Sequence, residues 1–180
     1  LKESEEEVIV KTGFEALIRK KFADPMPAFL RFETDSIGKT ANFAFDDPWD
    51  ERRYFRGGDN QLAGVGDGFA RDLPPWLETV ASLHPDFPVF GSVCEPHEML
   101  WRIIGSENVL YKMGEEPARF ARFIERLGDF AVGIVRGQAA AARGKLAGLM
   151  IWGDVAYTRG MFFSPAYWRA HFKPAVARLV

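Results

Sequence analysis

Residues 147–152 read Ala147-Gly148-Leu149-Met150-Ile151-Trp152, an apolar run with large side chains on both faces. Such a strand is typical of a parallel sheet that is covered on both sides. Before it, apolar residues recur at three- and four-residue steps over 116–143. This spacing predicts a long amphipathic helix. We expect it to be the longest helix, burying one row of side chains: Phe120, Phe123, Leu127, Phe130 and Ile134.

The segments around this pair of elements continue the alternation of strand and helix. Residues 87–93 form a second apolar run, and the text Glu95-Pro96-His97 then opens a helix that Gly105 closes. Further helices are expected after Pro74-Pro75, over 106–114 and after Ser164-Pro165. This order predicts an α/β fold in which the two apolar runs are parallel strands.

The N-terminal third has a different pattern. Residues 7–21 predict an antiparallel β-hairpin with its turn at Thr12-Gly13, and 28–32 predict a short edge strand. Asp46-Asp47-Pro48 predicts the start of a short helix over 46–56. The glycine-rich stretch 57–68 lacks the preceding strand and the Lys-Ser/Thr pair of a phosphate-binding loop, so we interpret it as a loop.

Composition excludes several classes of function. The chain of 180 residues has a net charge of −2, which gives no electrostatic case for nucleic acid or for an anionic membrane. Its single cysteine, Cys94, cannot form an intramolecular disulfide, and no apolar run reaches membrane-spanning length. We therefore expect a cytoplasmic protein. The arginines after residue 118 alternate with Glu125 and Asp129, which indicates a solvated helix face.

Residues 89–180 resemble the uroporphyrinogen decarboxylase superfamily, and 7–56 match its β-hairpin insertion more loosely. The resemblance implies a (β/α)8 barrel, of which this chain would be an incomplete piece. One domain would span 1–180, with a hairpin and loop insertion over 1–70 and β/α units over 71–180. The motifs that carry the resemblance are Val89-Phe90-Gly91, Glu95-Pro96-His97-Glu98-Met99-Leu100, Ile104-Gly105-Ser106-Glu107-Asn108, Glu116-Pro117, Met150-Ile151-Trp152-Gly153-Asp154 and Phe172-Lys173-Pro174.

The resemblance implies a carboxy-lyase that acts on a porphyrinogen or another small carboxylated substrate without a cofactor. The alternative within the superfamily is a methyltransferase that uses zinc and a corrinoid, with its metal ligands outside this chain. A ligand-binding barrel without catalysis is the third hypothesis. Two departures favour the alternatives to porphyrinogen chemistry: Arg102 stands where the decarboxylases have a tyrosine, and Gly153 replaces one of two acids.

The candidate site residues follow the two predicted strands, because ligands of such folds bind at the carboxyl ends of parallel strands. Asp154 and His97 are the candidate catalytic residues; a capping aspartate and a structural histidine are the alternatives. No metal ligand set is expected in the chain. A small-molecule substrate, a homodimer and a corrinoid protein are the partners considered, and the isolated chain is expected to lack turnover. The candidate substrate-binding residues are Arg159, Tyr157, Glu95 and Trp152.

Overall fold

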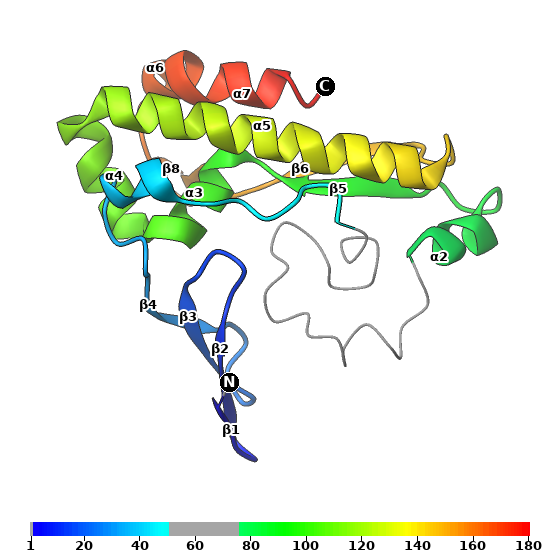
Figure 1. The fold of residues 1–180 in the computed structure, drawn as a ribbon, viewed down its shortest axis with the longest axis horizontal. Coiled ribbons are helices and arrows are strands. Elements are labelled where there is room, and N and C mark those ends of the chain that lie inside the picture. Colours follow the sequence, from blue (N-terminus) through cyan, green and yellow to red (C-terminus); the bar gives the residue numbers. More distant parts are fainter. Residues whose placement is uncertain (1, 51–75) are drawn as a thin grey trace.

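The computed structural model describes residues 2–50 and 76–180, and the side chains of 76–78 are outside this description. Within these ranges the fold is mixed α/β (Figure 1). The N-terminal third forms an antiparallel sheet in the order β1-β2-β3-β4. The strands are β1 (Lys2–Glu3), β2 (Glu7–Lys11), β3 (Leu17–Lys21) and β4 (Ala28–Arg31). The predicted hairpin and edge strand are thus confirmed, and β1 is an additional strand.

Aromatic side chains attach this sheet to the helices. Phe14, in the turn of the hairpin, is buried and packs edge-on against Phe43 and Phe130, each at 6.4 Å between ring centroids. Phe29 of β4 lies 5.3 Å from the ring of Trp101. The sheet therefore projects from the helical layer but is fixed to it by packed rings.

The segment that follows the sheet differs from expectation. Lys39–Asn42 form a 3-10 helix, η1, which the sequence did not predict. Residues 46–50 are not helical, because the Trp49 amide donates to the Asp47 side chain at 2.9 Å and closes a tight turn. The helix predicted over 46–56 is therefore wrong for these five residues. Its remainder, and the glycine-rich stretch 57–68, lie outside the described residues.

Two parallel strands, β5 (Phe90–Cys94) and β6 (Gly148–Trp152), form the second sheet. The parallel pairing confirms the prediction, but β5 begins three residues later than expected. The helix α2 (Trp76–Leu83) precedes it, and the Phe87 amide still donates to the carbonyl of Leu83 at 3.0 Å. Pro88 has no amide hydrogen to donate to a ladder, so regular pairing starts only after it.

The edge of β5 that faces away from β6 is occupied by a side chain. Gln138 accepts a hydrogen bond from the Ser92 amide at 2.8 Å and donates one to the Ser92 carbonyl at 2.6 Å. Gly91 permits this approach, because a Cβ there would lie only 2.8 Å from the Gln138 Oε1 atom. The amide of Gln138 thus satisfies the polar backbone groups that a neighbouring strand would otherwise bind.

Three helices connect β5 to β6: α3 (Pro96–Ile104), α4 (Ser106–Glu115) and α5 (Pro117–Ala142). As predicted, α5 is the longest helix described, and its five predicted core side chains are buried. In Figure 1 this helix lies between the two-stranded sheet and the C-terminal helices. The core gathers apolar side chains from all of these layers: Val93, Met99, Leu100, Ile103, Phe120, Phe123, Ile124, Leu127, Ile134 and Phe172.

After β6 the chain makes a small antiparallel pair, β7 (Ala156–Tyr157) and β8 (Gly160–Met161), which was not predicted. A continuous helical segment follows, composed of α6 (Pro165–Tyr167), a π-helical turn η3 (Trp168–Phe172) and α7 (Lys173–Ala177). Ser164 caps it as predicted, since its hydroxyl accepts the Tyr167 amide at 3.1 Å.

No closed barrel is present in the described part of the chain, whose only parallel pairing is between β5 and β6. The α/β class is therefore confirmed, while the (β/α)8 barrel and the division at residue 70 remain predictions. Among residues 2–50 and 76–180, no helix has both the length and the apolar character needed to cross a membrane.

Candidate functional site

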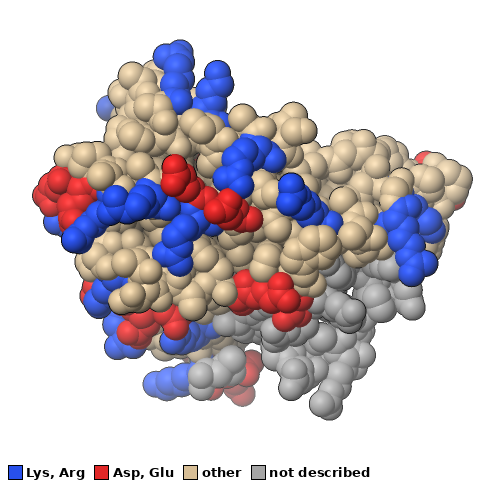
Figure 2. Space-filling model, turned by 45° about the horizontal axis from the view of Figure 1, so that its top comes forward, with Lys and Arg blue, Asp and Glu red and all other residues tan. Residues whose placement is uncertain are grey.

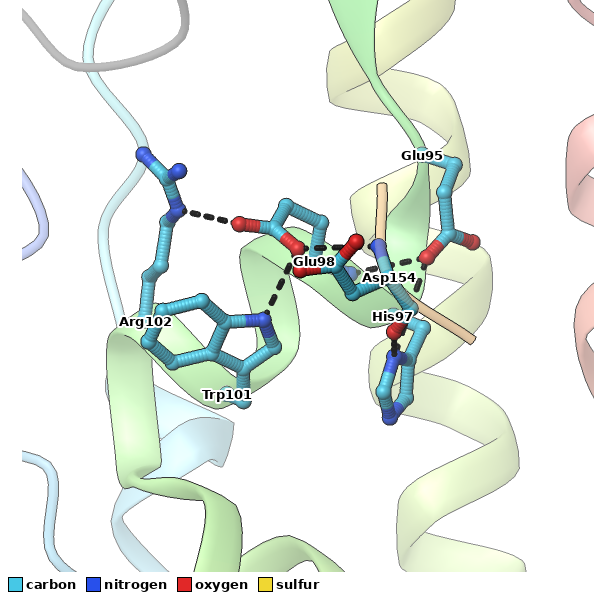
Figure 3. A network of polar contacts seen from close by, with 6 residues as sticks. All are labelled: Glu95, His97, Glu98, Trp101, Arg102 and Asp154. Carbon is cyan, nitrogen blue, oxygen red and sulfur yellow. Dashed lines mark hydrogen bonds and ion pairs between the residues drawn. The ribbon is translucent and has the colours of Figure 1, made fainter. Parts of the chain in front are cut away.

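The residues that follow the two parallel strands meet in one polar cluster (Figure 3). Beyond the end of β5, the Glu95 amide donates to the carbonyl of Trp152 at 2.9 Å and so extends the ladder by one step. His97 lies in the first turn of α3, and Asp154 lies two residues beyond β6. Parallel pairing thus brings together side chains that are more than fifty residues apart in sequence.

His97 is held in one orientation. Its Nδ1 atom lies 2.8 Å from the main-chain carbonyl oxygen of Asp154, and its ring packs among Phe162, Phe163 and Phe172. A carbonyl oxygen only accepts hydrogen bonds, so Nδ1 carries the proton and Nε2 is a free acceptor. Figure 3 shows Nε2 pointing away from the carboxylates. Burial lowers the pKa of His97, which favours this neutral form.

Glu95 caps helix α3 from a buried position. Its Oε1 atom accepts the Glu98 amide at 3.0 Å, while Oε2 is buried with no hydrogen-bond partner among the described residues. Burial raises the pKa of Glu95 from 4.5 to about 7. The side chain thus lies beside His97, at 3.8 Å from Nδ1, but binds no group that a substrate could reach.

Glu98 is the centre of the cluster, a role that the sequence analysis missed. Its carboxylate accepts hydrogen bonds from Trp101 Nε1 at 2.9 Å, Arg102 Nε at 2.8 Å and the Asp154 amide at 3.1 Å. The side chain is nearly inaccessible to solvent, so these three donors replace water. The four-residue spacing of Glu98 and Arg102 is a helical ion-pair signal that could have revealed the pair.

A cavity of about 300 Å³ opens beside this cluster. His97 and Asp154 both line it, and Asp154 is solvent-exposed. Because the main chain of Asp154 holds both His97 and Glu98, its carboxylate makes neither of those contacts. The wall is mainly apolar, and the lining residues are His97, Trp101, Ser106, Leu110, Asp154 and Phe162.

The other predicted substrate-binding residues lie outside the lining of this cavity. Tyr157 is exposed and stacks on Phe162 at 5.7 Å, so it reaches the wall only through that ring. Arg159 lies in the exposed turn between β7 and β8. Trp152 donates from Nε1 to the Ser92 hydroxyl at 2.9 Å and is half-buried. The structure therefore brings Glu95, His97 and Asp154 together, and it places Arg159 apart from them.

Arg102 is the cation that the structure places next to the cluster. Its guanidinium carbon lies 5.5 Å from the ring centre of Trp101 and 5.1 Å from that of Trp152. These two indoles and the Glu98 carboxylate fix the plane of the group. Among the described residues only its Nε atom has a hydrogen-bond partner, and Figure 3 shows the terminal nitrogens directed away from Glu98.

Gly153 explains why a second acid is missing next to Asp154. A Cβ at position 153 would lie 2.5 Å from Glu95 Cγ and 3.0 Å from Glu98 Cβ. Such distances are well below ordinary contact, so any larger residue would displace the cap of α3. The buried Glu95 therefore takes the space that a side chain at position 153 would need.

The comparisons with known proteins do not identify this site. No family model, curated protein or solved structure matches the chain. No group of three or more His, Cys, Asp or Glu side chains in the described part of the chain is arranged to hold a metal ion. The residues described here therefore do not fit the zinc centre of the methyltransferase alternative, and the site is defined by its own geometry.

Proposed function

We propose that this chain carries part of the active site of a cytoplasmic, uroporphyrinogen decarboxylase-like carboxy-lyase. The observation that carries the proposal is the pair His97 and Asp154 on one cavity at the carboxyl ends of parallel strands. This is where α/β folds bind their substrates. The resemblance over 89–180 supplies the reaction class, and a small carboxylated molecule is the proposed substrate.

The chemistry assigned to His97 is proton transfer. When CO2 leaves, the electron pair of the broken carbon–carbon bond stays on the substrate carbon, which must take up a proton. Nε2 faces the cavity, accepts a proton from solvent and donates it to that carbon. The carbonyl of Asp154 on Nδ1 stabilises the transient imidazolium. The lowered pKa of His97 makes this imidazolium a stronger acid.

The carboxylate of Asp154 would orient the substrate or the water that reprotonates Nε2. Arg102 is assigned a different task, binding a carboxylate that does not react. A cation on the reacting carboxylate would stabilise the ground state and slow the loss of CO2. The planar, stacked guanidinium suits a bidentate contact with a second carboxylate, which favours substrates that carry several.

Binding can be tested on the 180-residue chain itself. Uroporphyrin, a stable polycarboxylated analogue, should quench the fluorescence of Trp101 and Trp152 on titration. Arg102→Gln should weaken binding about tenfold, the loss of one charged hydrogen-bonding group. Arg136→Gln is the matched control, because Arg136 is exposed on α5 away from the site. Equal affinities for both variants would remove Arg102 from the proposal.

Turnover should be measured as CO2 release by the complete gene product, with zinc-dependent methyl transfer to a thiol assayed in parallel. His97→Gln and Asp154→Asn should each lower CO2 release by about 100-fold. Asp154→Asn leaves the main-chain contact with His97 in place, so it tests the carboxylate alone. His84→Gln and Asp86→Asn, both exposed, are the controls. Methyl transfer without CO2 release would contradict the proposed reaction.

A further inference from the structure

A second cavity, of about 450 Å³, opens between η1 and the first half of α5. It shares no lining residue with the cavity beside His97. Three arginines on successive turns of α5 line it, and no carboxylate does. The lining residues are Ile37, Gly38, Thr40, Ala41, Arg119, Arg122, Phe123 and Arg126.

Arg126 fixes the shape of this cavity. Its guanidinium donates to the carbonyl of Thr40 at 2.7 Å and to that of Phe43, and so holds the turn that follows η1. The same group lies over the ring of Phe123, at 5.6 Å from its centre. These partners are neutral, so the charge of a half-buried guanidinium is not balanced by a carboxylate here.

Arg119 and Arg122 are exposed members of the same lining. Arg119 pairs with Glu116 at 3.0 Å, whereas Arg122 has no ion-pair partner among the described residues. Like charges three and four residues apart on a helix repel each other. The sequence had suggested a solvated face with alternating charges, but the structure turns three cations toward one hollow. Figure 2 shows basic side chains gathered in a row on the surface where α5 begins.

We propose that this cavity binds an organic phosphate, with its phosphate between Arg119 and Arg122 and an apolar part against Phe123. A doubly charged oxyanion matches two guanidinium groups with planar donor forks. Ile37, Ala41 and Phe123 supply an apolar wall for the rest of the ligand. The cavity volume lies within the range of small-molecule sites.

The proposal can be tested by calorimetric titration of the 180-residue chain with phenyl phosphate, inorganic phosphate and benzoate. Phenyl phosphate should bind tightest, because inorganic phosphate lacks the apolar part and benzoate has a single charge. Arg122→Gln and Arg119→Gln should each weaken phenyl phosphate binding about tenfold. Arg126 is left unchanged, because its substitution would release the turn after η1.

Arg136→Gln is the control, since it removes one exposed arginine from the same helix outside the cavity. It should bind phenyl phosphate as the wild type does, and circular dichroism should show all variants folded. Three results would overturn the proposal: no phenyl phosphate binding at millimolar concentration, equal weakening by Arg122→Gln and Arg136→Gln, or equal affinity for phenyl phosphate and benzoate. Because the readout is binding, it is independent of any CO2 release at the other site.

Discussion

The Nδ1 atom of His97 lies 2.8 Å from the main-chain carbonyl oxygen of Asp154. This contact joins the helix that follows β5 to the loop that follows β6. Because the backbone of Asp154 makes it, the tautomer of His97 is fixed without using the Asp154 carboxylate. The candidate acid and the candidate base therefore have separate supports, and each can be altered without removing the other.

The first prediction concerns that tautomer. Nitrogen-15 NMR should show His97 protonated at Nδ1 and not at Nε2 at pH 7, with a pKa below the ordinary value of 6.5. The unfolded chain binds this proton more readily, so His97 should reduce the free energy of unfolding as pH falls below 6.5. His97→Gln identifies the signals. An Nε2-protonated tautomer would contradict the arrangement.

The second prediction uses the raised pKa of Glu95. Unfolded, this carboxyl ionises near 4.5, whereas in the folded chain it ionises near 7. The free energy of unfolding should therefore fall as pH rises from about 4.5 to 7, by on the order of 3 kcal/mol for this group. Glu95→Gln keeps an oxygen for the cap of α3 and should remove this slope.

Urea denaturation at pH 5, 6, 7 and 8 measures that slope, and the difference between wild type and variant isolates Glu95 from other titrating groups. Glu107→Gln, at an exposed site in the first turn of α4, is the matched control and should keep the wild-type slope. If Glu95→Gln and wild type lose stability in parallel, the buried carboxyl is ionised in the folded chain.

The third prediction concerns the space at position 153. Gly153→Ala should destabilise the fold by roughly 1–3 kcal/mol, because its Cβ would meet Glu95 and Glu98. Gly114→Ala is the control, since a Cβ there meets nothing within 4 Å and position 114 is helical. That change should raise stability by about 0.5–1 kcal/mol. Thermal unfolding of both variants decides between crowding and a general effect of replacing glycine.

The fourth prediction separates core from cavity wall. Leu127→Ala should lower the free energy of unfolding by about 2–5 kcal/mol, because Leu127 is fully buried on α5. Leu110→Ala should have a much smaller effect, since Leu110 is 44% exposed and lines the cavity beside His97. Chemical denaturation measures both. Similar losses would mean that the cavity wall is part of the core.

Periodicity predicted the part of the fold that depends on local sequence. The three- and four-residue spacing of Phe120, Phe123 and Leu127 on α5 and the apolar run of β6 act over a few residues, and both are confirmed. The helix at 46–50 failed because the Asp47 side chain closes a turn there. β7 and β8 were missed because strands of two residues carry no periodic signal.

The site was only partly predictable for a related reason. Strand ends indicated Glu95, His97 and Asp154, because that rule depends on topology alone. The role of Glu98 depends on three donors that come together only in the folded chain, and one of them is the main chain of Asp154. Likewise, the stacking of Arg102 between two indoles depends on α3 lying beside the end of β6.

The contact between Gln138 and Ser92 also bears on how this chain associates with other chains. An open strand edge is a template on which another strand can pair, and such pairing leads to aggregation. With Gln138 in place, an incoming strand must first displace a side-chain amide that makes two hydrogen bonds. Gln138 thus acts as a gatekeeper against intermolecular β-pairing, and any barrel strand that joined β5 would have to exchange with it.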